Sequence, residues 1–151
     1  MSYPMIHQQI KVENEALGHV TRALEVAIAW EVKGPDLSRK LSSVRFAIEL
    51  FQRQVERLFA LEELDGYMVR VSRARPEWSD QIEELRQEHD QCRAAIRRAV
   101  IQLDHASPTD VGQLDAICEA LRDVMLRLVQ HGHRENEMVV ESVNLDIGGE
   151  G

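Results

Sequence analysis

The sequence has few cysteines, no long hydrophobic run and fewer basic than acidic residues. Its two cysteines, Cys92 and Cys118, both fall within helical patterns, which argues against a disulfide framework and favours a reducing compartment. No apolar run approaches the ~20 residues of a membrane-spanning helix, and residues 1–15 lack the basic and apolar blocks of a secretion signal. A net charge of −8 argues against nucleic acid as a partner, because neutralising phosphates requires a basic face. We therefore expect a cytoplasmic protein that has neither a membrane nor a nucleic acid as partner.

Residues that interrupt helices are also scarce. The chain has only four prolines and eight glycines in 151 residues, and three of the prolines, with Gly34, separate segments of helical length. Those segments cover residues of about 6–32, 37–71, 79–105 and 111–143. Because the connections are short, consecutive helices are expected to be antiparallel neighbours. The sequence therefore predicts one all-α domain over 1–151, an antiparallel up-down-up-down four-helix bundle.

Apolar residues recur at alternating steps of three and four, the spacing of a helix face that packs into a core. The second segment has the clearest stripe: Leu41, Val44, Ile48, Phe51, Val55 and Leu58. Four residues continue or interrupt these stripes with polar groups: Glu62 in the second segment, His89 in the third, and His131 and Glu135 in the fourth. A buried carboxylate has to be paired, protonated or bound to a cation, so these positions carry the functional information.

The position of these four residues along their helices brings them to one level of the bundle. In an antiparallel bundle the start of the third segment lies beside the ends of the second and fourth segments. Each of the four residues lies about ten residues from that end of its helix, and each residue adds ~1.5 Å of helix length, so all four fall at a similar height. His131 and Glu135 are four residues apart, so both project from one helix face. Two imidazoles and two carboxylates in a dry core predict a site for iron, manganese or zinc. Taken singly, each residue could be a satisfied polar group in a core or the result of a stripe read one position wrong, and for a lone histidine that explanation is favoured.

The other polar candidates have simpler explanations. The helical angle directs His19 and His133 outward, and His105 ends the third segment, where an imidazole favours the helix dipole. Cys92 follows His89 on the same stripe and reads as a small core residue. Glu63 is expected at the rim of the cluster.

The chain resembles the hemerythrin-like (HHE cation-binding) family over nearly its whole length. Three stretches carry the resemblance: LFALEELDGY at 58–67, LRQEH at 85–89 and HGHRENEMVVESVNLDIG at 131–148. The family is a four-helix bundle that holds two irons with one histidine on each of helices one and three and a His-x-x-x-Glu motif on each of helices two and four. By position, His89 and His131 would bind one metal, and Glu62 and Glu135 would be the carboxylates that bridge two metals.

The family's remaining two histidines fall on Asn14 and Leu58, which are degenerate ligand positions. The resemblance therefore implies a divergent member with an incomplete di-iron ligand set and at most one retained metal position. Iron, mononuclear or absent, is the expected cofactor, another transition metal is the alternative, and the metal ion is the expected partner. Asn14 could hydrogen-bond a metal-bound water or Glu62, or equally could fix the helix register.

The expected role is metal binding linked to iron, oxygen or redox sensing or handling. One alternative is a bundle that has lost its metal and serves as an interaction or structural module; another is an oxidase-type metalloenzyme. No nucleophile with its base, phosphate loop or nucleotide fingerprint is present in the sequence. Acyl- or phosphoryl-transfer catalysis is therefore not expected, and a non-enzymatic role is favoured.

Overall fold

The computed structural model describes residues 3–64 and 67–148, and these residues are almost entirely helical. Five α-helices and two short 3-10 helices follow one another in this order: α1 Tyr3–Ala29, η1 Gly34–Asp36, α2 Leu37–Leu64, α3 Tyr67–Ala74, η2 Pro76–Trp78, α4 Ser79–Asp104 and α5 Val111–Gly148. No strand occurs within the described residues. The prediction of an all-α chain is confirmed.

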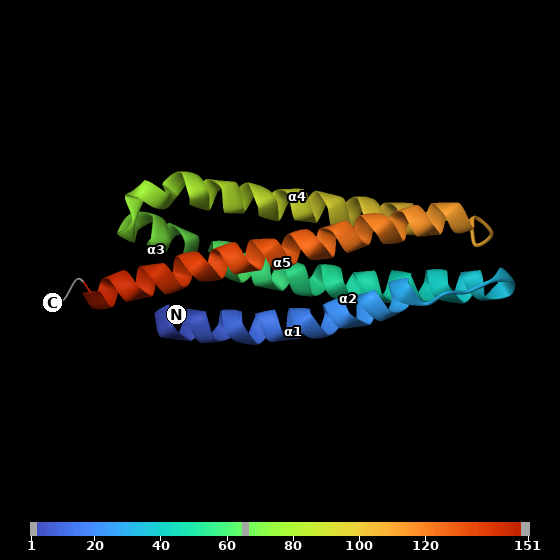
Figure 1. Cartoon of the computed structure of the whole chain (residues 1–151), viewed down its shortest axis with the longest axis horizontal. Helices are drawn as coiled ribbons and strands as arrows, with labels where there is room; N and C mark the ends of the chain where they lie inside the picture. Colours follow the sequence, from blue (N-terminus) through green and yellow to red (C-terminus); the bar gives the residue numbers. More distant parts are fainter. Residues whose placement is uncertain (1–2, 65–66, 149–151) are drawn as a thin grey trace.

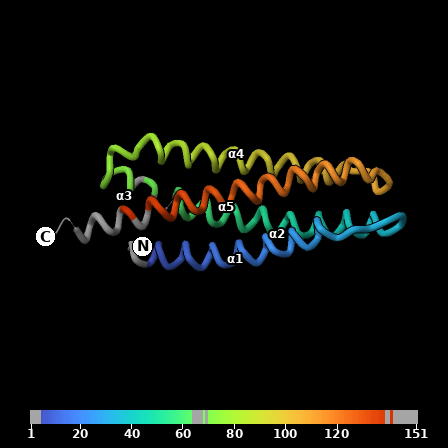
Figure 2. Tube along the Cα trace, in the orientation of Figure 1, coloured from blue at the N-terminus to red at the C-terminus, as the bar shows by residue number. Residues whose placement is uncertain are grey.

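The long helices α1, α2, α4 and α5 run along the length of the molecule, and each reverses the direction of the one before it (Figure 1). The short helix α3 lies at one end, between α2 and α4 in the chain order. At this same end α1 begins, α2 ends and α4 begins (Figure 2). Among the described residues, no helix is both long enough and apolar enough to cross a bilayer.

The second helix differs from its predicted extent. One helix is predicted over 37–71, whereas α2 ends at Leu64 and a separate helix α3 begins at Tyr67. Residues 65–66, Asp-Gly in the sequence, lie outside the described residues, and this pair is a frequent helix breaker. The first helix also ends earlier than predicted, at Ala29. Gly34, which opens η1, has a φ of 61°, a backbone conformation that favours glycine.

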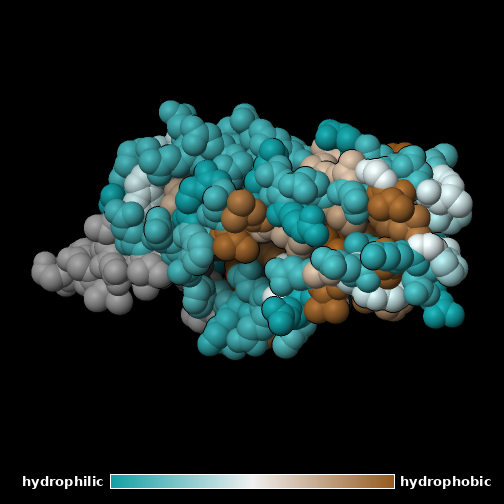
Figure 3. All heavy atoms as spheres, turned by 45° about the vertical axis from the view of Figure 1, so that its right-hand side comes forward, coloured by the Kyte–Doolittle hydropathy of each residue, from teal (hydrophilic) through white to brown (hydrophobic). Residues whose placement is uncertain are grey.

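The hydrophobic core consists of two clusters of buried side chains. The larger cluster runs through α1, α2, α4 and α5 and includes Phe51, Ile96 and Leu121. The smaller one, at the end that carries α3, joins these residues: Ile6, Met68, Val71, Trp78, Ile82 and Leu85. On α4, His89 lies between the smaller and the larger cluster in sequence, so polar side chains are placed where the two clusters meet. The surface is mostly hydrophilic, with hydrophobic side chains and a recess on the face that Figure 3 shows.

Candidate metal centre

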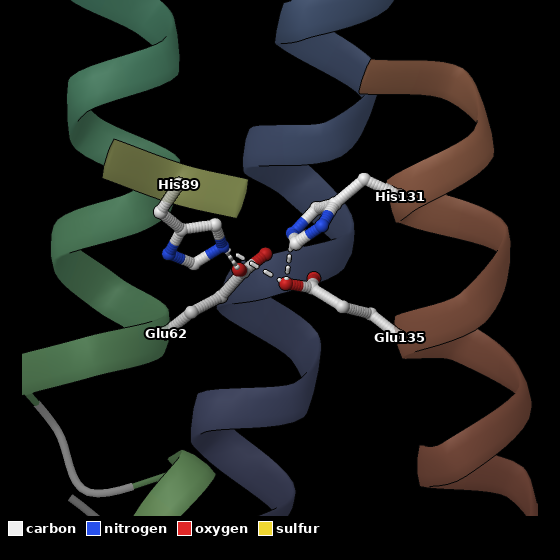
Figure 4. Close-up of side chains that lie close together, drawn as sticks. All are labelled: Glu62, His89, His131 and Glu135. Atoms are coloured by element: carbon white, nitrogen blue, oxygen red, sulfur yellow. Dashed lines mark hydrogen bonds and ion pairs between the residues drawn. The ribbon is translucent and has the colours of Figure 1, made fainter. Parts of the chain in front are cut away.

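Four side chains from three helices converge in the interior: Glu62 from α2, His89 from α4, and His131 and Glu135 from α5 (Figure 4). All four are buried, with exposed fractions between 0% for His89 and 9% for Glu135. One nitrogen or oxygen atom of each lies within 4.8 Å of the corresponding atoms of the other three. The stripes of α2, α4 and α5 thus bring two imidazoles and two carboxylates to one point.

The Nε2 atoms of both histidines face the two carboxylates. His89 Nε2 lies 3.0 Å from Glu62 Oε2 and 3.0 Å from Glu135 Oε1. His131 Nε2 lies 2.5 Å from Glu135 Oε1. Glu135 therefore contacts both rings, and the cluster has its nitrogen atoms on one side and its oxygen atoms on the other.

The second nitrogen of each ring is held by a further carboxylate. His89 Nδ1 lies 2.7 Å from Glu63 Oε1, and His131 Nδ1 lies 2.5 Å from Glu88 Oε2. A carboxylate at Nδ1 fixes the proton on that nitrogen and leaves the Nε2 lone pair to face the centre. This is the arrangement by which proteins orient histidines that ligate a metal.

Arginines hold these two outer carboxylates in place. Arg93 donates two hydrogen bonds to Glu63, of 3.0 and 2.9 Å, and Arg134 donates to Glu88 at 2.7 Å. Burial alone acts to raise the pKa of Glu63, but the hydrogen bonds from Arg93 and His89 lower it below its ordinary value. Glu63 therefore remains a carboxylate, able to accept the Nδ1 proton.

Phe59 on α2 supports the ring of His89 from one side. The two rings are stacked, with centroids 3.8 Å apart and an angle of 11° between their planes. Phe59 is itself fully packed in the larger hydrophobic cluster. The ring of His89 is thus fixed both by its hydrogen bonds and by an aromatic wall.

Without a cation the cluster is an ion-pair network. Burial and the charge of Glu135 raise the pKa of Glu62 well above its ordinary value, against the close contact with the imidazole of His89. Burial also acts to raise the pKa of Glu135, but the close contacts with the imidazoles of His131 and His89 lower it to about 2. Burial acts to lower the pKa of His89, yet the close contacts with the carboxylates of Glu135 and Glu62 raise it to about 10. The acidic centre therefore attracts positive charge, whether a proton or a metal ion.

The donor atoms fit a metal ion. Glu62 Oε2 and His131 Nε2 are buried and make no hydrogen bond, although each lies within 3.0 Å of a neighbour, because the atoms are not aligned for one. Ligand atoms about 2.1 Å from one ion are at most about 4.2 Å apart, close to the 4.8 Å spread of this cluster. Two nitrogens and carboxylate oxygens suit iron, manganese or zinc.

The chain matches the family model of the hemerythrin HHE cation-binding domain over residues 5–143. The chain belongs to this family. All four converging residues lie within the matched range, and domains of the family bind metal ions, typically iron. Comparison with curated proteins and with solved structures gives no match.

The two degenerate positions of the hemerythrin ligand set lie beside the cluster. Leu58 on α2 is buried, whereas Asn14 on α1 is exposed, and both line a cavity of about 450 Å³ that reaches Glu62, His131 and Glu135. Asn14 therefore does not occupy a buried position on α1, which its interpretation as a core residue that fixes the helix register would require.

Glu13 takes the buried position of Asn14 on α1. Its side chain accepts a 2.5 Å hydrogen bond from Gln54 Nε2 and lies 3.5 Å from Arg57. Gln54 also donates to the backbone oxygen of Glu13, at 3.1 Å. These partners satisfy the carboxylate inside the helix interface, which turns Asn14 toward the cavity and solvent.

Three further histidines, His19, His105 and His133, lie outside the cluster, and the first and last of them are directed outward by the helical angle. His19 on α1 and His133 on α5 are both exposed. His105 is also exposed, and its Nδ1 lies 2.9 Å from the backbone oxygen of Ile101 in the last turn of α4. None of these three belongs to the group of candidate ligands.

The sequence patterns do not predict Glu88, Arg93, Arg134 or Phe59 as parts of the site. Glu88 is adjacent to His89 in sequence, but it contacts His131 on the facing helix α5. Its pairing with Arg134, three residues after His131, joins α4 to α5. A search for a carboxylate next to each core histidine would have found Glu88 as a candidate, though not its partner.

Proposed function

We propose that this hemerythrin-domain protein binds a single transition-metal ion, iron, through Glu62, His89, His131 and Glu135. The role that fits such a centre is handling iron or sensing oxygen or redox state. We further propose that α1, α2, α4 and α5 act as the antiparallel four-helix bundle of the family, with α3 as an addition, and that the protein works in the cytoplasm. The two free cysteines, both buried, agree with a reducing compartment.

The observation that carries this proposal is the pair of histidine–carboxylate contacts behind the cluster. A neutral imidazole has one donor and one acceptor nitrogen, and here both rings have Nδ1 on an outer carboxylate and direct Nε2 toward the same centre. Each outer carboxylate is in turn paired with an arginine. Two such series of contacts, each from an arginine through a carboxylate to a histidine, are expected for metal ligands and are not needed for packing.

The number of ions follows from the missing histidines. A second ion beside Glu62 and Glu135 would need nitrogen ligands at positions 14 and 58, which hold an exposed asparagine and a buried leucine. The aliphatic side chain of Leu58 has no donor atom. We therefore expect one tightly bound ion per chain.

The chain's own residues would hold the ion and control access to it. Glu62, His89, His131 and Glu135 would ligate it, and Glu63 and Glu88 would keep both rings in the ligating tautomer. Phe59 and the larger cluster exclude water from the side of His89. A bound iron would supply redox chemistry at this centre through a change of its oxidation state.

Metal analysis of protein purified without chelators tests the proposal. The wild type is expected to contain about one iron per chain, and a His89→Ala variant close to none, because half of the nitrogen ligands are removed. His19→Ala is the matched control and is expected to retain the wild-type content, since His19 is exposed. Wild-type protein without any transition metal, also after addition of Fe²⁺, would contradict the proposal.

A metal-free interaction module is the second candidate. It is favoured by the ion pairs of His89 with Glu62 and Glu135, which let the cluster satisfy itself with protons alone. This candidate predicts that the fold is indifferent to metal, so that saturating Fe²⁺ leaves the melting temperature unchanged. The metal-binding proposal predicts an increase, because an ion that binds only the folded chain stabilises it.

A further inference from the structure

A cavity of about 450 Å³ lies between α1, α2 and α5 and ends on the candidate ligands. One water takes up about 30 Å³ in the liquid, so a diatomic gas would fill only a small part of this volume. Cavities that bind small organic molecules range from about 300 to 1,000 Å³. The volume therefore suits an organic molecule of modest size.

The walls of the cavity are mostly apolar. Five hydrophobic side chains line it: Ile10, Leu17, Leu58, Phe59 and Leu128. Its rim carries exposed polar residues, among them Lys11 on α1 and Asn136 on α5. An apolar wall with a polar mouth favours a ligand whose body is hydrophobic.

The inner end of the cavity presents buried polar atoms without hydrogen bonds. Glu62 and His131 line the cavity with exposed fractions of 2% and 3%, and Glu62 Oε2 and His131 Nε2 make no hydrogen bond. A carboxylate accepts hydrogen bonds at both oxygens, so Glu62 can accept one from a ligand whether or not it also holds an ion. The ligand is therefore expected to carry a donor group at the end that enters first.

Gly132 on α5 keeps part of the cavity open. A Cβ added at this residue would meet no atom within 4 Å, so packing does not require a glycine there. Within a helix, glycine is the least favourable residue apart from proline. A larger side chain at position 132 would occupy the cavity.

We propose that this cavity binds a small, largely apolar molecule with one neutral hydroxyl group, which donates a hydrogen bond to Glu62. A phenol is the simplest such molecule. An anionic head is disfavoured by the carboxylates Glu62 and Glu135 at the inner end, and the charged side chains Lys11 and Glu15, which also line the cavity, are exposed. The inference deepens the proposed function, because the cavity ends on three of the four candidate metal ligands.

Calorimetric titration with three probes of similar shape tests the proposal: 4-ethylphenol, ethylbenzene and 4-ethylbenzoate. Metal-loaded and metal-free wild type are both expected to bind 4-ethylphenol, and to bind the other two probes about tenfold more weakly or not at all. Equal binding of ethylbenzene would contradict the role of the hydroxyl group. No binding of 4-ethylphenol to either form would overturn the proposal.

Two glycine variants locate the probe. Gly132→Leu is expected to abolish binding of 4-ethylphenol while retaining the metal content of wild type. Gly18→Leu is the matched control, because Gly18 is also a helical glycine whose added Cβ would meet nothing, and it does not line the cavity. Undiminished binding to Gly132→Leu would overturn the proposal. If that variant fails to fold or loses metal, Leu17→Phe fills the same cavity from α1 and decides the question.

The metal content separates this proposal from the one on which it rests. If the protein holds one ion per chain but binds no probe, the cavity proposal is wrong and the metal proposal stands. If the protein binds 4-ethylphenol in the cavity but never holds a metal, the metal proposal is wrong and the cavity proposal stands.

Discussion

At the scale of single residues, the rings of His89 and His131 are each fixed at both nitrogens. The Nδ1 atoms contact Glu63 and Glu88, and the Nε2 atoms contact the inner carboxylates. A histidine that only fills a core needs neither a second carboxylate nor an arginine behind it. The outer contacts therefore distinguish a ligand pair from two buried polar side chains.

The Glu88→Gln variant tests this distinction. Glutamine retains the shape of the side chain but loses the charge that makes the His131 imidazole a better ligand, so metal affinity is expected to fall about 10- to 100-fold. Glu84→Gln is the control, an exposed glutamate one turn earlier on α4. Competition against a chelator measures both affinities, and equal values for the two variants would show that Glu88 does not act through the metal.

The His131→Ala variant tests the buried charge of Glu135 in metal-free protein. His131 Nε2 lies 2.5 Å from Glu135 Oε1, and its removal leaves a buried carboxylate with one partner fewer. A loss of about 3 kcal/mol in the free energy of unfolding is expected near neutral pH. His133→Ala, two residues further along α5 and exposed, is expected to change stability little. A His131→Ala protein as stable as the His133→Ala protein would exclude the buried ion pair.

The sequence predicts the four residues that converge at the centre of the site, but not the residues that contact the histidines from outside. Glu62, His89, His131 and Glu135 interrupt apolar stripes, so helical periodicity alone brings them together. Glu88 and Arg134 lie beside the stripes, where charged residues are common and mostly solvated. Their contacts depend on the rotation of α4 against α5, which spacing along one helix does not determine.

At the scale of elements, α1 and α2 form the incomplete side of the site. Leu58 and Asn14 line the same cavity, which reaches the carboxylates of Glu62 and Glu135. An Asn14→His, Leu58→His double variant is therefore expected to add a nitrogen ligand from each helix and to raise the content from one ion to two per chain. Loss of the apolar Leu58 side chain is expected to cost a modest part of the stability of the metal-free form.

A second double variant controls for added histidine as such. Val12→His with Leu58→His places one imidazole on α1 at an exposed residue that does not line the cavity. This protein is expected to stay at one ion per chain by elemental analysis. If the Asn14→His, Leu58→His protein folds and also holds one ion, Asn14 and Leu58 do not correspond to the lost ligands.

The helix boundaries show where periodicity fails as a guide. The apolar pattern predicts one helix over 37–71, but it carries no information on the direction of the chain after Leu64, and the Asp-Gly pair at 65–66 is the only local sign of a break. On α1 the stripe is weak, and the buried pair of Glu13 with Gln54 sets the rotation of the helix. A carboxylate satisfied by a neighbouring helix is not recognisable from its own spacing.

At the scale of the whole molecule, the cluster links the stability of the metal-free fold to pH. The folded pKa of Glu135 is about 2, below its ordinary value of 4.5, so its contribution is present above pH 4.5 and is lost as the pH falls toward 2. The folded pKa of His89 is about 10, above its ordinary value of 6.5, so its contribution is present below pH 6.5 and is lost as the pH rises toward 10. The pKa of Glu62 is raised in the folded state, so Glu62 also lowers the stability of the fold as the pH rises above 4.5.

Denaturant unfolding of metal-free protein at a series of pH values checks this dependence. The free energy of unfolding is expected to be highest near pH 4.5, to fall by a few kcal/mol as the pH decreases toward 2, and to fall also as the pH increases toward 10. A His89→Gln variant is expected to lose much of the decline between pH 6.5 and 10. A wild-type free energy that is constant from pH 6 to 10 would contradict the charged state of His89.

The all-helical architecture is the part that the sequence predicts best. Prolines and glycines are rare in the chain, and apolar residues recur at helical spacing over most of its length. The meeting of α2, α4 and α5 at one level is also predicted, since the polar interruptions lie at matching distances from the helix ends. The cavity beside them was not predicted, because its existence depends on how far α1 and α5 are apart, and α1 contacts α2 far more than α5.

The X-ray absorption spectrum of protein carrying one equivalent of iron tests the central claim most directly, because it reports the atoms around the ion. A single ion held by Glu62, His89, His131 and Glu135 predicts imidazole nitrogens and carboxylate oxygens at about 2.0–2.2 Å, with no metal–metal distance near 3.5–4 Å. The outer-shell signal of imidazole is expected to disappear in the His89→Ala, His131→Ala double variant. A spectrum without imidazole in the wild type, or one with a second iron beside the first, would contradict the account.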